Sequence, residues 1–445
     1  MFIRTCLLLL VTPVFPSFAL VSQPVWAAAV LKAGASRRDI SFPELLAGAK
    51  VHDPLFARVL VLDDGQHRAA IVCVDLLRPW FEEVREKIRS ELGCTLVLVN
   101  CSHTHADGHR QHNSKWRRAV GEQIFAAAKE AVEQLVPVTL HSGRAPAAIG
   151  HNRYGKAFTQ DVVPWVNVLE ARAADGRKIA VLFEHPAHPV LTMDAPGGLS
   201  ADFPGYAVAR IEKQLGDGVV AMFANGCAGN ANARPVYGVK SGWYDNAARE
   251  GNKLGDAVLV ALDKSTEIKA RSFTTRTKKI LLPLRTPTLK EWALQMARLE
   301  EANPGDVAML QSQLQLPKKI DPNNPPGLEM EINALMFGRE WCLVTTGGEP
   351  FTEYELWIDA VAPFDRTMVF GYTNDVAKPK EKHYSSYLLT DRALALSIKH
   401  PAQASRFCRD AHRMHYATTH EDVRLPYAVG LEGAIKRGIH SLWGE

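Results

Sequence analysis

Two histidines separated by one residue, His103 and His105, come directly after the apolar run 96–99. In an extended segment alternate side chains point to the same side, so both rings could face one metal ion or one substrate. Neutral imidazole is the commonest metal ligand in proteins and the usual acid or base near neutral pH. The spacing therefore indicates metal binding or acid–base chemistry, although two loop histidines can also be ordinary hydrogen-bonded side chains.

A second pair of histidines, His185 and His188, follows the apolar run 179–183 in the same manner. Functional groups in α/β proteins gather where strands end, so histidines from two strands are expected to converge. One member of this pair is expected to do no more than cap the following turn. The chain therefore offers histidines for one shared site from two separate places.

An acidic residue, Glu349, stands between a predicted strand at 340–346 and a predicted helix at 351–360. It could complete a zinc site made of two histidines and one glutamate, or it could be a charge favoured by the positive end of the helix. The sequence contains neither HExxH nor GxSxG. These absences exclude a thermolysin-type zinc site and weaken the case for a serine hydrolase.

Two further polar clusters have simpler interpretations. Residues 200–206 look like the start of a helix, with Asp202 as the N-cap and Pro204 in the first turn. Residues 223–230 form a glycine-bearing turn whose backbone amides could approach an anion or a carbonyl oxygen, but the lysine–serine ending of a Walker loop is missing. Asp75 and Asp202 could orient ligand histidines, although a structural role is favoured for both.

The elements that must position these residues alternate between buried strands and helices. Strands are predicted at 57–63, 69–75, 95–100, 179–183, 219–223, 340–346 and 367–370, and helices at 81–92, 115–134, 206–214, 243–262, 288–301 and 351–360. Continuous apolar strands between helices are typical of sheets that are covered on both faces. The pattern predicts an α/β fold, a large layered sandwich of mostly buried sheets covered by helices.

The composition is that of a large folded protein. Of the 445 residues, 47% are hydrophobic and 22% are charged, which excludes intrinsic disorder. The net charge of +4, with both signs well mixed, gives no reason to expect nucleic acid as a partner. Seven cysteines are too few for a disulfide scaffold, and Cys73 and Cys342 lie in strand-like runs where buried thiols are expected.

Residues 1–29 have the pattern of a secretory signal peptide. Arg4 precedes an apolar stretch, and Val25–Ala29 offers small residues for cleavage. Pro13 and Pro16 interrupt the apolar stretch before the ~20 residues needed to span a bilayer. We therefore expect the rest of the chain, residues 30–445, to be exported, either secreted or periplasmic, with no transmembrane segment.

Taken in order, these clusters resemble the catalytic domain of the neutral/alkaline, non-lysosomal ceramidases. The matching stretches are 31–34 (LKAG), 100–105 (NCSHTH), 150–153 (GHNR), 188–189 (HP), 200–206 (SADFPGY), 225–229 (NGCAG), 348–351 (GEPF) and 371–374 (GYTN). Together they span about residues 31–395. The resemblance implies a single α/β catalytic domain that holds one zinc ion and hydrolyses an amide without a covalent nucleophile.

The resemblance also implies roles for individual residues. His103, His188 and Glu349 correspond to zinc ligands. Tyr387 corresponds to a fourth ligand, a tyrosine, with Tyr384 as the competing candidate.

Two more residues are implied beside the metal. His105 would bind or protonate the reacting group, and Arg153 matches an arginine that contacts the substrate. Zinc lowers the pKa of bound water to about 7 and acts as a Lewis acid. His105 and Arg153 would then stabilise the oxyanion, and His105 or a nearby tyrosine would return a proton to the leaving amine.

Three departures from the family pattern concern the substrate and the domain organisation. Segment 106–113 is polar and basic where the family has Ser-Gly-Pro-Gly, and 378–383 is an insertion. No second tyrosine follows Tyr387 at the family's spacing. About 50 residues remain after the matched region, so the C-terminal β-sandwich domain of full-length ceramidases is expected to be missing.

These observations predict a zinc-dependent amidohydrolase that cleaves an amide bond of a lipid, ceramide in the family, with a zinc-activated water. An alternative keeps the zinc and takes a polar or carbohydrate-like small molecule, to which His109, Arg110, Gln111, His112 and Asn113 look suited. A third possibility is a non-catalytic binding protein on the same fold. The oligomeric state is left open.

Overall fold

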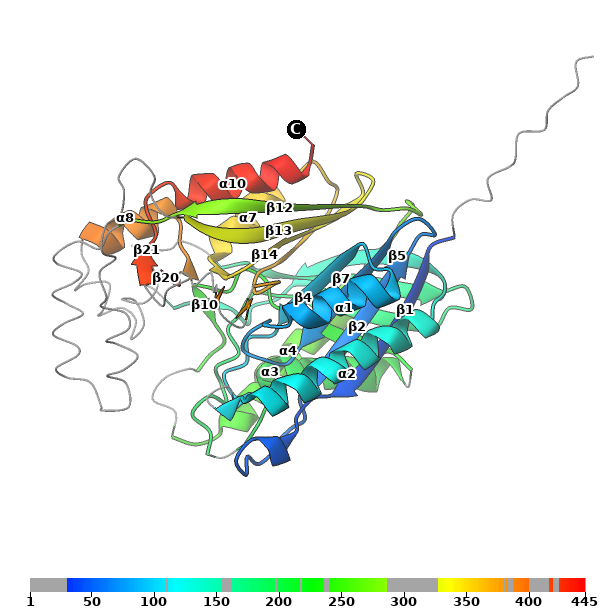
Figure 1. Cartoon of the computed structure of the whole chain (residues 1–445). Helices are drawn as coiled ribbons and strands as arrows, with labels where there is room; N and C mark the ends of the chain where they lie inside the picture. The colour runs from blue at the N-terminus through cyan, green and yellow to red at the C-terminus, as the bar shows by residue number, and fades with distance from the viewer. Residues whose placement is uncertain are drawn as a thin grey trace, which may run out of the picture.

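The computed structural model consists of two sheets and the helices that cover them (Figure 1). The described residues are 30–108, 111–153, 162–196, 198–216, 218–235, 240–285, 327–375, 377–378, 381–382, 387–399, 416–418 and 424–444. The signal-peptide pattern at 1–29 and the helix predicted at 288–301 lie outside them.

The larger sheet has nine strands. Their order is β4 (Leu96–Cys101), β3 (Arg68–Val74), β2 (Phe56–Asp63), β1 (Lys32–Asp39), β5 (Val136–Pro146), β7 (Trp165–Ala173), β8 (Lys178–Glu184) and β9 (Val220–Ala224), with β11 (Thr266–Ile268) beside β5. Pairs β3–β4 and β8–β9 are parallel, so each needs a crossover, which α1 (Glu82–Leu92) and α3 (Asp202–Leu215) supply. One β-α-β unit therefore stands at each end of the sheet.

The two halves of this sheet pack against each other. Only two residue pairs, between β1 and β5, join the halves. Leu60 and Leu98 of one half share a core with Leu169 and Leu182 of the other. The end of β4 thereby reaches the end of β9, where the amide of Asn225 donates to the side chain of Asn100 at 3.0 Å. Strand ends that are distant within the sheet thus meet in space.

Helices cover the outer faces of both halves (Figure 1). The helices α1 and α2 (Ser114–Glu133) pack on the half that contains β1–β4, and α3 and α4 (Trp243–Asp263) pack on the other. In α2 the buried residues Val120, Ile124, Ala127 and Ala131 recur every three or four positions and form the face against the sheet. The layers run helix, sheet, sheet, helix, which confirms the predicted sandwich of buried sheets.

The second sheet lies against the same core. It consists of β12 (Thr274–Pro283), β13 (Gly327–Phe337), β14 (Trp341–Thr346) and β16 (Thr367–Phe370). Phe337 and Phe370 on one face join the core of the large sheet. The other face packs against α7 (Thr352–Val361), α8 (Asp391–Lys399) and α10 (Leu431–Leu442).

The short elements are η1 (Pro43–Leu45) and the strand pairs β6 (His151–Asn152) with β10 (Ala231–Asn232), β15 (Glu349–Pro350) with β19 (Tyr387–Leu388), β17 (Ala377–Lys378) with β18 (Glu381–Lys382), and β20 (Tyr416–Thr418) with β21 (Arg424–Pro426).

The prediction that Asp202 is an N-cap is wrong. Ala201 is the capping position, and Asp202 is the first residue of α3, with a φ of 56°. Its carboxylate accepts from the amide of Phe203 at 2.6 Å and from the amide and the hydroxyl of Thr192 at 2.7 and 2.8 Å. These hydrogen bonds turn the side chain inward and connect the helix to the preceding loop. Burial raises the pKa of Asp202 to about 6.

The cysteines within the described residues lie in the interior, and none of the helices there resembles a membrane span. Cys73 and Cys342 are buried free thiols, as expected, and so are Cys94, Cys101 and Cys227. Over the described ranges, no helix combines the length and apolar character needed to cross a membrane.

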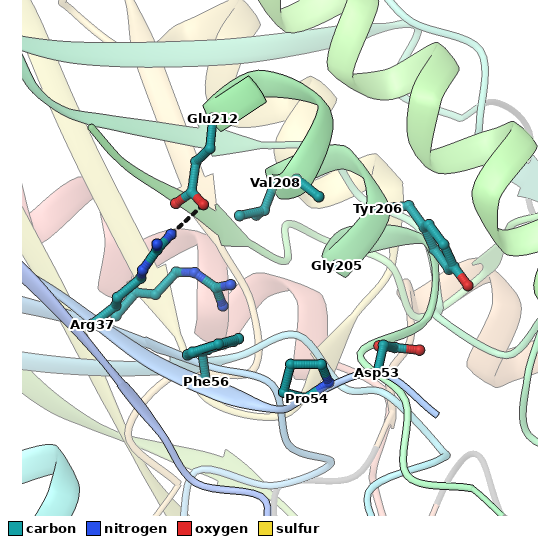
Figure 2. Close-up of a pocket in the computed structure, with 10 residues that line it drawn as sticks. Arg37, Asp53, Pro54, Phe56, Gly205, Tyr206, Val208 and Glu212 are labelled. Atoms are coloured by element: carbon teal, nitrogen blue, oxygen red, sulfur yellow. Dashed lines mark hydrogen bonds and ion pairs between the residues drawn. The ribbon is translucent and has the colours of Figure 1, made fainter. Parts of the chain in front are cut away.

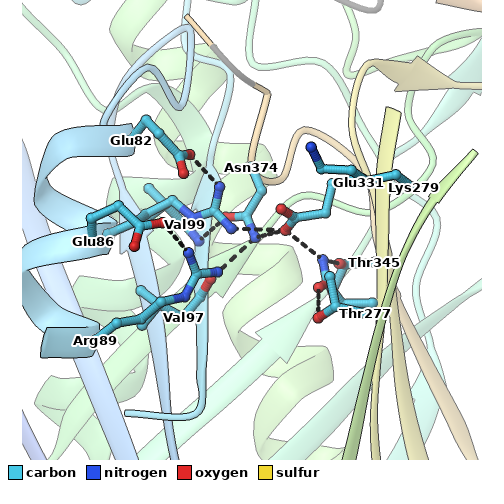
Figure 3. A network of polar contacts seen from close by, with 12 residues as sticks. Glu82, Glu86, Arg89, Val97, Val99, Thr277, Lys279, Glu331, Thr345 and Asn374 are labelled. Carbon is cyan, nitrogen blue, oxygen red and sulfur yellow. Dashed lines mark hydrogen bonds and ion pairs between the residues drawn. The ribbon is translucent and has the colours of Figure 1, made fainter. Parts of the chain in front are cut away.

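A buried polar network fastens the two sheets together (Figure 3). Asn374 accepts from the amide of Val99 at 2.8 Å and donates to the carbonyl of Val97 at 3.1 Å. It also donates to Glu331 at 2.8 Å, and Arg85 of α1 donates to the same carboxylate at 2.8 Å. Burial alone would raise the pKa of Glu331, but the charge of Arg85 and these hydrogen bonds hold it below its usual value.

Replacing Arg85 with methionine is expected to lower the free energy of unfolding by about 3 kcal/mol, because the carboxylate of Glu331 would stay buried without its cation. Urea unfolding measures the change. The double variant Arg85→Met, Glu331→Leu should recover much of the loss. Arg89 pairs with Glu86 on the same helix in a more exposed position, so Arg89→Met should change stability by less than about 1 kcal/mol. Equal effects of the two single variants would contradict the role of the network.

Candidate metal centre

The segment after β4 places His103 in the interior. The chain turns left-handed there, with His103 at a φ of 67°, and the ring is almost fully buried. Its Nδ1 lies 2.7 Å from the carbonyl oxygen of Leu77, and Asp107 accepts from the amide of Leu77 at 2.8 Å. Because a carbonyl oxygen can only accept, Nδ1 carries a hydrogen, and in the neutral ring Nε2 presents a lone pair.

His188, after β8, is held in the same way. Its amide donates to the carbonyl of Ala231 at 2.9 Å, and its Nδ1 lies 2.7 Å from the carbonyl oxygen of Ala228. The side chain is 0% exposed, and burial lowers its pKa to about 4, so the ring is neutral at pH 7. Its Nε2 therefore also presents a lone pair.

Glu349 completes a cluster of three acceptor atoms. Its Oε2 lies 2.9 Å from Nε2 of His188 and 3.4 Å from Nε2 of His103. Two ring lone pairs and a carboxylate oxygen at this distance repel one another unless a cation or a proton lies between them. Two imidazole nitrogens and one carboxylate oxygen form a donor set that zinc uses in hydrolytic sites.

His105 stands beside this cluster. Its ring centre lies 5.1 Å from that of His103 and 6.2 Å from that of His188, and ligand nitrogens of the three rings lie within 4.8 Å of one another. The two histidines of the SHTH stretch do face one place, as expected, although a turn and not an extended strand brings them there. Two donor sets therefore share His103 and His188. One is completed by Glu349 and the other by His105.

Two short strand pairs bring Tyr387 and Arg153 to the same region. Tyr387 of β19 is directly opposite Glu349 of β15, and its ring stacks on that of His188 with 6.1 Å between the ring centres. Arg153 follows β6, and its Nη1 donates to the hydroxyl of Tyr387 at 3.3 Å. Tyr384 lies outside the described residues. All six predicted site residues thus belong to one region.

His185 has a structural role, as expected of one member of its pair, but it binds earlier segments of the chain instead of capping the following turn. Its Nδ1 lies 2.7 Å from the carbonyl oxygen of Trp165, and its Nε2 accepts from the amide of Gly150 at 3.3 Å. Burial lowers its pKa to about 4, which keeps the ring neutral. Both ring nitrogens are used by the backbone, so His185 contributes nothing to the cluster.

Tyr372 is a residue of this region for which the sequence suggested no role. Its ring centre lies 4.5 Å from that of His103, and its buried hydroxyl has no hydrogen-bond partner among the described residues. Burial and the charge of Glu349 raise its pKa well above 10, so the hydroxyl keeps its proton. Its φ of 49° is uncommon for an aromatic residue. An unpaired buried hydroxyl and a left-handed backbone each cost on the order of 1–3 kcal/mol. The only sequence signal was its place in the GYTN stretch.

Neither Asp75 nor Asp202 contacts a histidine of the cluster through a hydrogen bond. Asp75 accepts from Nη1 of Arg58 at 2.7 Å and from the amide of Phe56 at 2.9 Å, and Asp202 accepts from Thr192. The structural role favoured for both residues therefore holds. Backbone carbonyl oxygens, not carboxylates, orient the two deeply buried rings.

The polar segment after the SHTH stretch supports helix α2. The ring of His112 stacks on Trp116 with 3.6 Å between the ring centres, and its Nε2 lies 3.0 Å from the carbonyl oxygen of Asp107. Asn113 is the N-cap of α2 and accepts from the amide of Trp116 at 2.9 Å. Residues 109–110 lie outside the described ranges. His112 and Asn113 thus have structural partners of their own.

The glycine-bearing loop 225–230 rests on two buried carboxyl groups. A Cβ on Gly226 would lie 2.1 Å from Oε1 of Glu184 and 2.7 Å from Oε2 of Glu355, so only glycine fits. The amide of Cys227 donates to Glu355 at 3.1 Å. The sequence suggested that a backbone amide of this turn could approach an anion. The amide of Cys227 does so, but the acceptor is a carboxyl group of the protein itself. Burial raises the pKa of both groups, and that of Glu355 to about 8.

Glu355→Gln is expected to make stability less dependent on pH. A carboxyl whose pKa is raised stabilises the fold fully below its unfolded pKa of about 4.5, and this contribution is lost as the pH rises toward 8. Between pH 5 and 8 the wild type should therefore lose up to about 1.4 kcal/mol per pH unit from this group, and the variant should lose less. Urea unfolding at both pH values measures the difference, with Glu86→Gln on the surface as control. Equal slopes in all three proteins would contradict a buried, protonated Glu355.

None of the predicted site residues lines the cavity shown in Figure 2. This cavity of about 340 Å³ lies between the start of β2 and α3, with Phe56 on one wall. Arg37 is paired with Glu212 and Arg58 with Asp75, and Asp53 accepts hydrogen bonds from Ser200 and the amide of Ala201. The possible metal ligands His103, His105 and His188 are therefore not part of this cavity.

Comparisons with known proteins bear on the fold. A scan against protein-family models gives no match, and neither does a search of curated proteins. Among solved structures, a ceramidase complexed with C2 is similar with a TM-score of 0.64 and 18% identity, over 82% of this chain and 71% of that one. The neutral ceramidase from Pseudomonas aeruginosa gives a TM-score of 0.62 and 18% identity, over 87% of this chain and 74% of that one. The protein therefore has the fold of the neutral ceramidases, as its sequence clusters predicted.

Proposed function

We propose that the protein is an exported zinc-dependent hydrolase that cleaves a linear amide bond, as the ceramidases of the same fold suggest. The observation that carries this proposal is the meeting of three acceptor atoms, Nε2 of His103, Nε2 of His188 and Oε2 of Glu349. Neutral imidazoles and an ionised carboxylate that face one another are suited to a divalent cation. Export is supported by the signal-peptide pattern at 1–29.

His103, His188 and Glu349 would hold the ion, with Tyr387 as a further ligand beside Glu349. When bound, zinc would supply an activated water and polarise the carbonyl group of the substrate. The chain's own groups have other tasks. Arg153 would bring positive charge to the substrate oxygen, and His105 would return a proton to the leaving amine.

The ceramidases of the same fold suggest a substrate class. Ceramide is an amide of a fatty acid, so we propose an N-acyl lipid as the substrate. A polar or carbohydrate-like substrate has less support, because two of the residues that suggested it, His112 and Asn113, hold Trp116 and the start of α2. His105 is partly exposed beside the cluster, as a group that meets a substrate would be, which favours a hydrolase over a binding protein.

Metal analysis followed by a substrate panel tests the proposal. The purified protein should contain one zinc per chain and hydrolyse a long-chain ceramide or a short N-acyl amide, with activity lost to a chelator and restored by zinc. Turnover confined to glycosidic or other polar compounds would favour the alternative substrate. Zinc without turnover on any compound would favour a binding protein, and a protein that takes up no zinc would remove the proposal.

A further inference from the structure

Two fully buried tyrosines of this chain have hydroxyl groups without a hydrogen-bond partner in the described parts of the structure, Tyr372 and Tyr427. Tyr427 lies in an apolar core with Leu282 and Leu431. The ring of Tyr372 packs instead against the ring of His103. It also stands edge-on to the ring of His188, and the centres of the Tyr372 and His188 rings lie 5.9 Å apart. The same unpaired group therefore occurs in two very different surroundings.

The backbone of Tyr372 is bound to two of the three segments that carry the acceptor cluster. Its amide donates to the carbonyl of Gly348, the residue before Glu349, at 2.9 Å. Its carbonyl accepts from the amide of Cys101, two residues before His103, at 3.2 Å. These two hydrogen bonds hold the residue in its left-handed conformation and keep the ring against the histidines. A bulky residue persists in this conformation only where its surroundings enforce it, and such positions are concentrated at functional sites.

We propose that Tyr372 is a further catalytic residue, whose hydroxyl donates a hydrogen bond to the carbonyl oxygen of the bound amide as that oxygen becomes negative. This inference rests on the proposed function. When water attacks, its oxygen bonds to the carbonyl carbon, one of its protons passes to His105, and the π electron pair moves to the carbonyl oxygen. This pair then re-forms the carbonyl bond as the C–N bond breaks with its electron pair, and His105 gives the proton to the nitrogen. Tyr372 keeps its O–H bond throughout and acts only as a donor, which is most effective in a site that excludes water.

Tyr372→Phe separates this role from a structural one. The hydroxyl has no partner in the fold, so its removal should leave the stability unchanged or higher and leave the uptake of Co²⁺, one per chain, unchanged. Acetohydroxamate, a small oxyanion, would be titrated into the Co²⁺-loaded protein and followed by visible absorption. We expect its Kd to be at least tenfold weaker in the variant. With the best amide of the substrate panel, kcat should fall by about 10²- to 10³-fold with little change in KM.

Tyr427→Phe is the matched control, because it also removes a buried, unpartnered hydroxyl but lies in the apolar core. It should change neither the Kd of acetohydroxamate nor kcat. An unchanged Kd and kcat in Tyr372→Phe, in a protein that binds Co²⁺ and hydrolyses an amide, would overturn the role of Tyr372 alone. Loss of Co²⁺ from Tyr372→Phe would also overturn it, in favour of a metal ligand. A wild type that binds no metal would instead remove the proposed function, and this inference with it.

Discussion

Alanine at position 188 is expected to leave the protein without stoichiometric zinc and to reduce amide hydrolysis to background. His188 is the most deeply buried member of the cluster, and its Nε2 lies 2.9 Å from Glu349. Loss of an outer hydrogen bond to a ligand typically weakens metal affinity by about 10- to 100-fold, so loss of the ligand itself should exceed that. Elemental analysis after dialysis against metal-free buffer measures the bound zinc. His103→Ala should give the same result.

The control comes from the same strand end. His185 is also fully buried, but the backbone uses both of its ring nitrogens. His185→Gln should therefore lower the free energy of unfolding while one zinc per chain remains. If His188→Ala keeps full zinc, or if His185→Gln loses zinc while it remains folded, the assignment of the ion to this cluster is wrong.

The second large effect is expected at His105. If His103, His188 and Glu349 hold the ion, His105→Ala should keep one zinc per chain and lose about 10²- to 10⁴-fold in turnover, as expected for a missing acid or base. Its ring is more exposed than those of the two deeply buried histidines, which suits a group that meets the substrate. Zinc content and kcat are measured on the same preparation, so that metal loss and chemical impairment are separated.

The matched variant for this test is Glu349→Gln, which preserves size and removes the charge. It should lose zinc where His105→Ala does not, because in the proposed assignment the carboxylate and not the third imidazole completes the donor set. Loss of zinc from His105→Ala with retention in Glu349→Gln would reverse the assignment, in favour of the three histidines whose ligand nitrogens lie within 4.8 Å of one another. Full turnover in His105→Ala would end its role as acid or base.

Local patterns were sufficient to predict β2, β3, β4, β8, β9, β14 and β16 and the helices α1, α2, α3, α4 and α7, whereas the long strands β1, β5, β7, β12 and β13 were not predicted. The apolar run that became β4 and the helical periodicity that became α2 depend on neighbouring residues alone, and both were predicted to within a residue or two. The polar residues after these runs could therefore be recognised as candidates. The start of α3 was misjudged, since Asp202 is turned inward by Thr192, a contact between loops that periodicity does not report.

The meeting of the histidines depends on long-range packing. His103 follows β4 and His188 follows β8, and these strands belong to opposite halves of a sheet that is joined by two residue pairs between β1 and β5. The halves pack together because apolar side chains from both form one core. No spacing within the chain encodes that contact.

The side chains around the cluster were likewise predicted only in part from the sequence, and long-range packing decided the rest. Residue types and short motifs already indicated a histidine- and glutamate-rich site on an α/β scaffold, because the local tendency of a segment to form a strand or a helix is written in its own residues. Tertiary packing decided that Tyr387 lies opposite Glu349, that carbonyl oxygens and not carboxylates orient the rings, and that Tyr372 stands against His103. These contacts join segments that are distant along the chain, so their geometry exists only after the cores between them have formed.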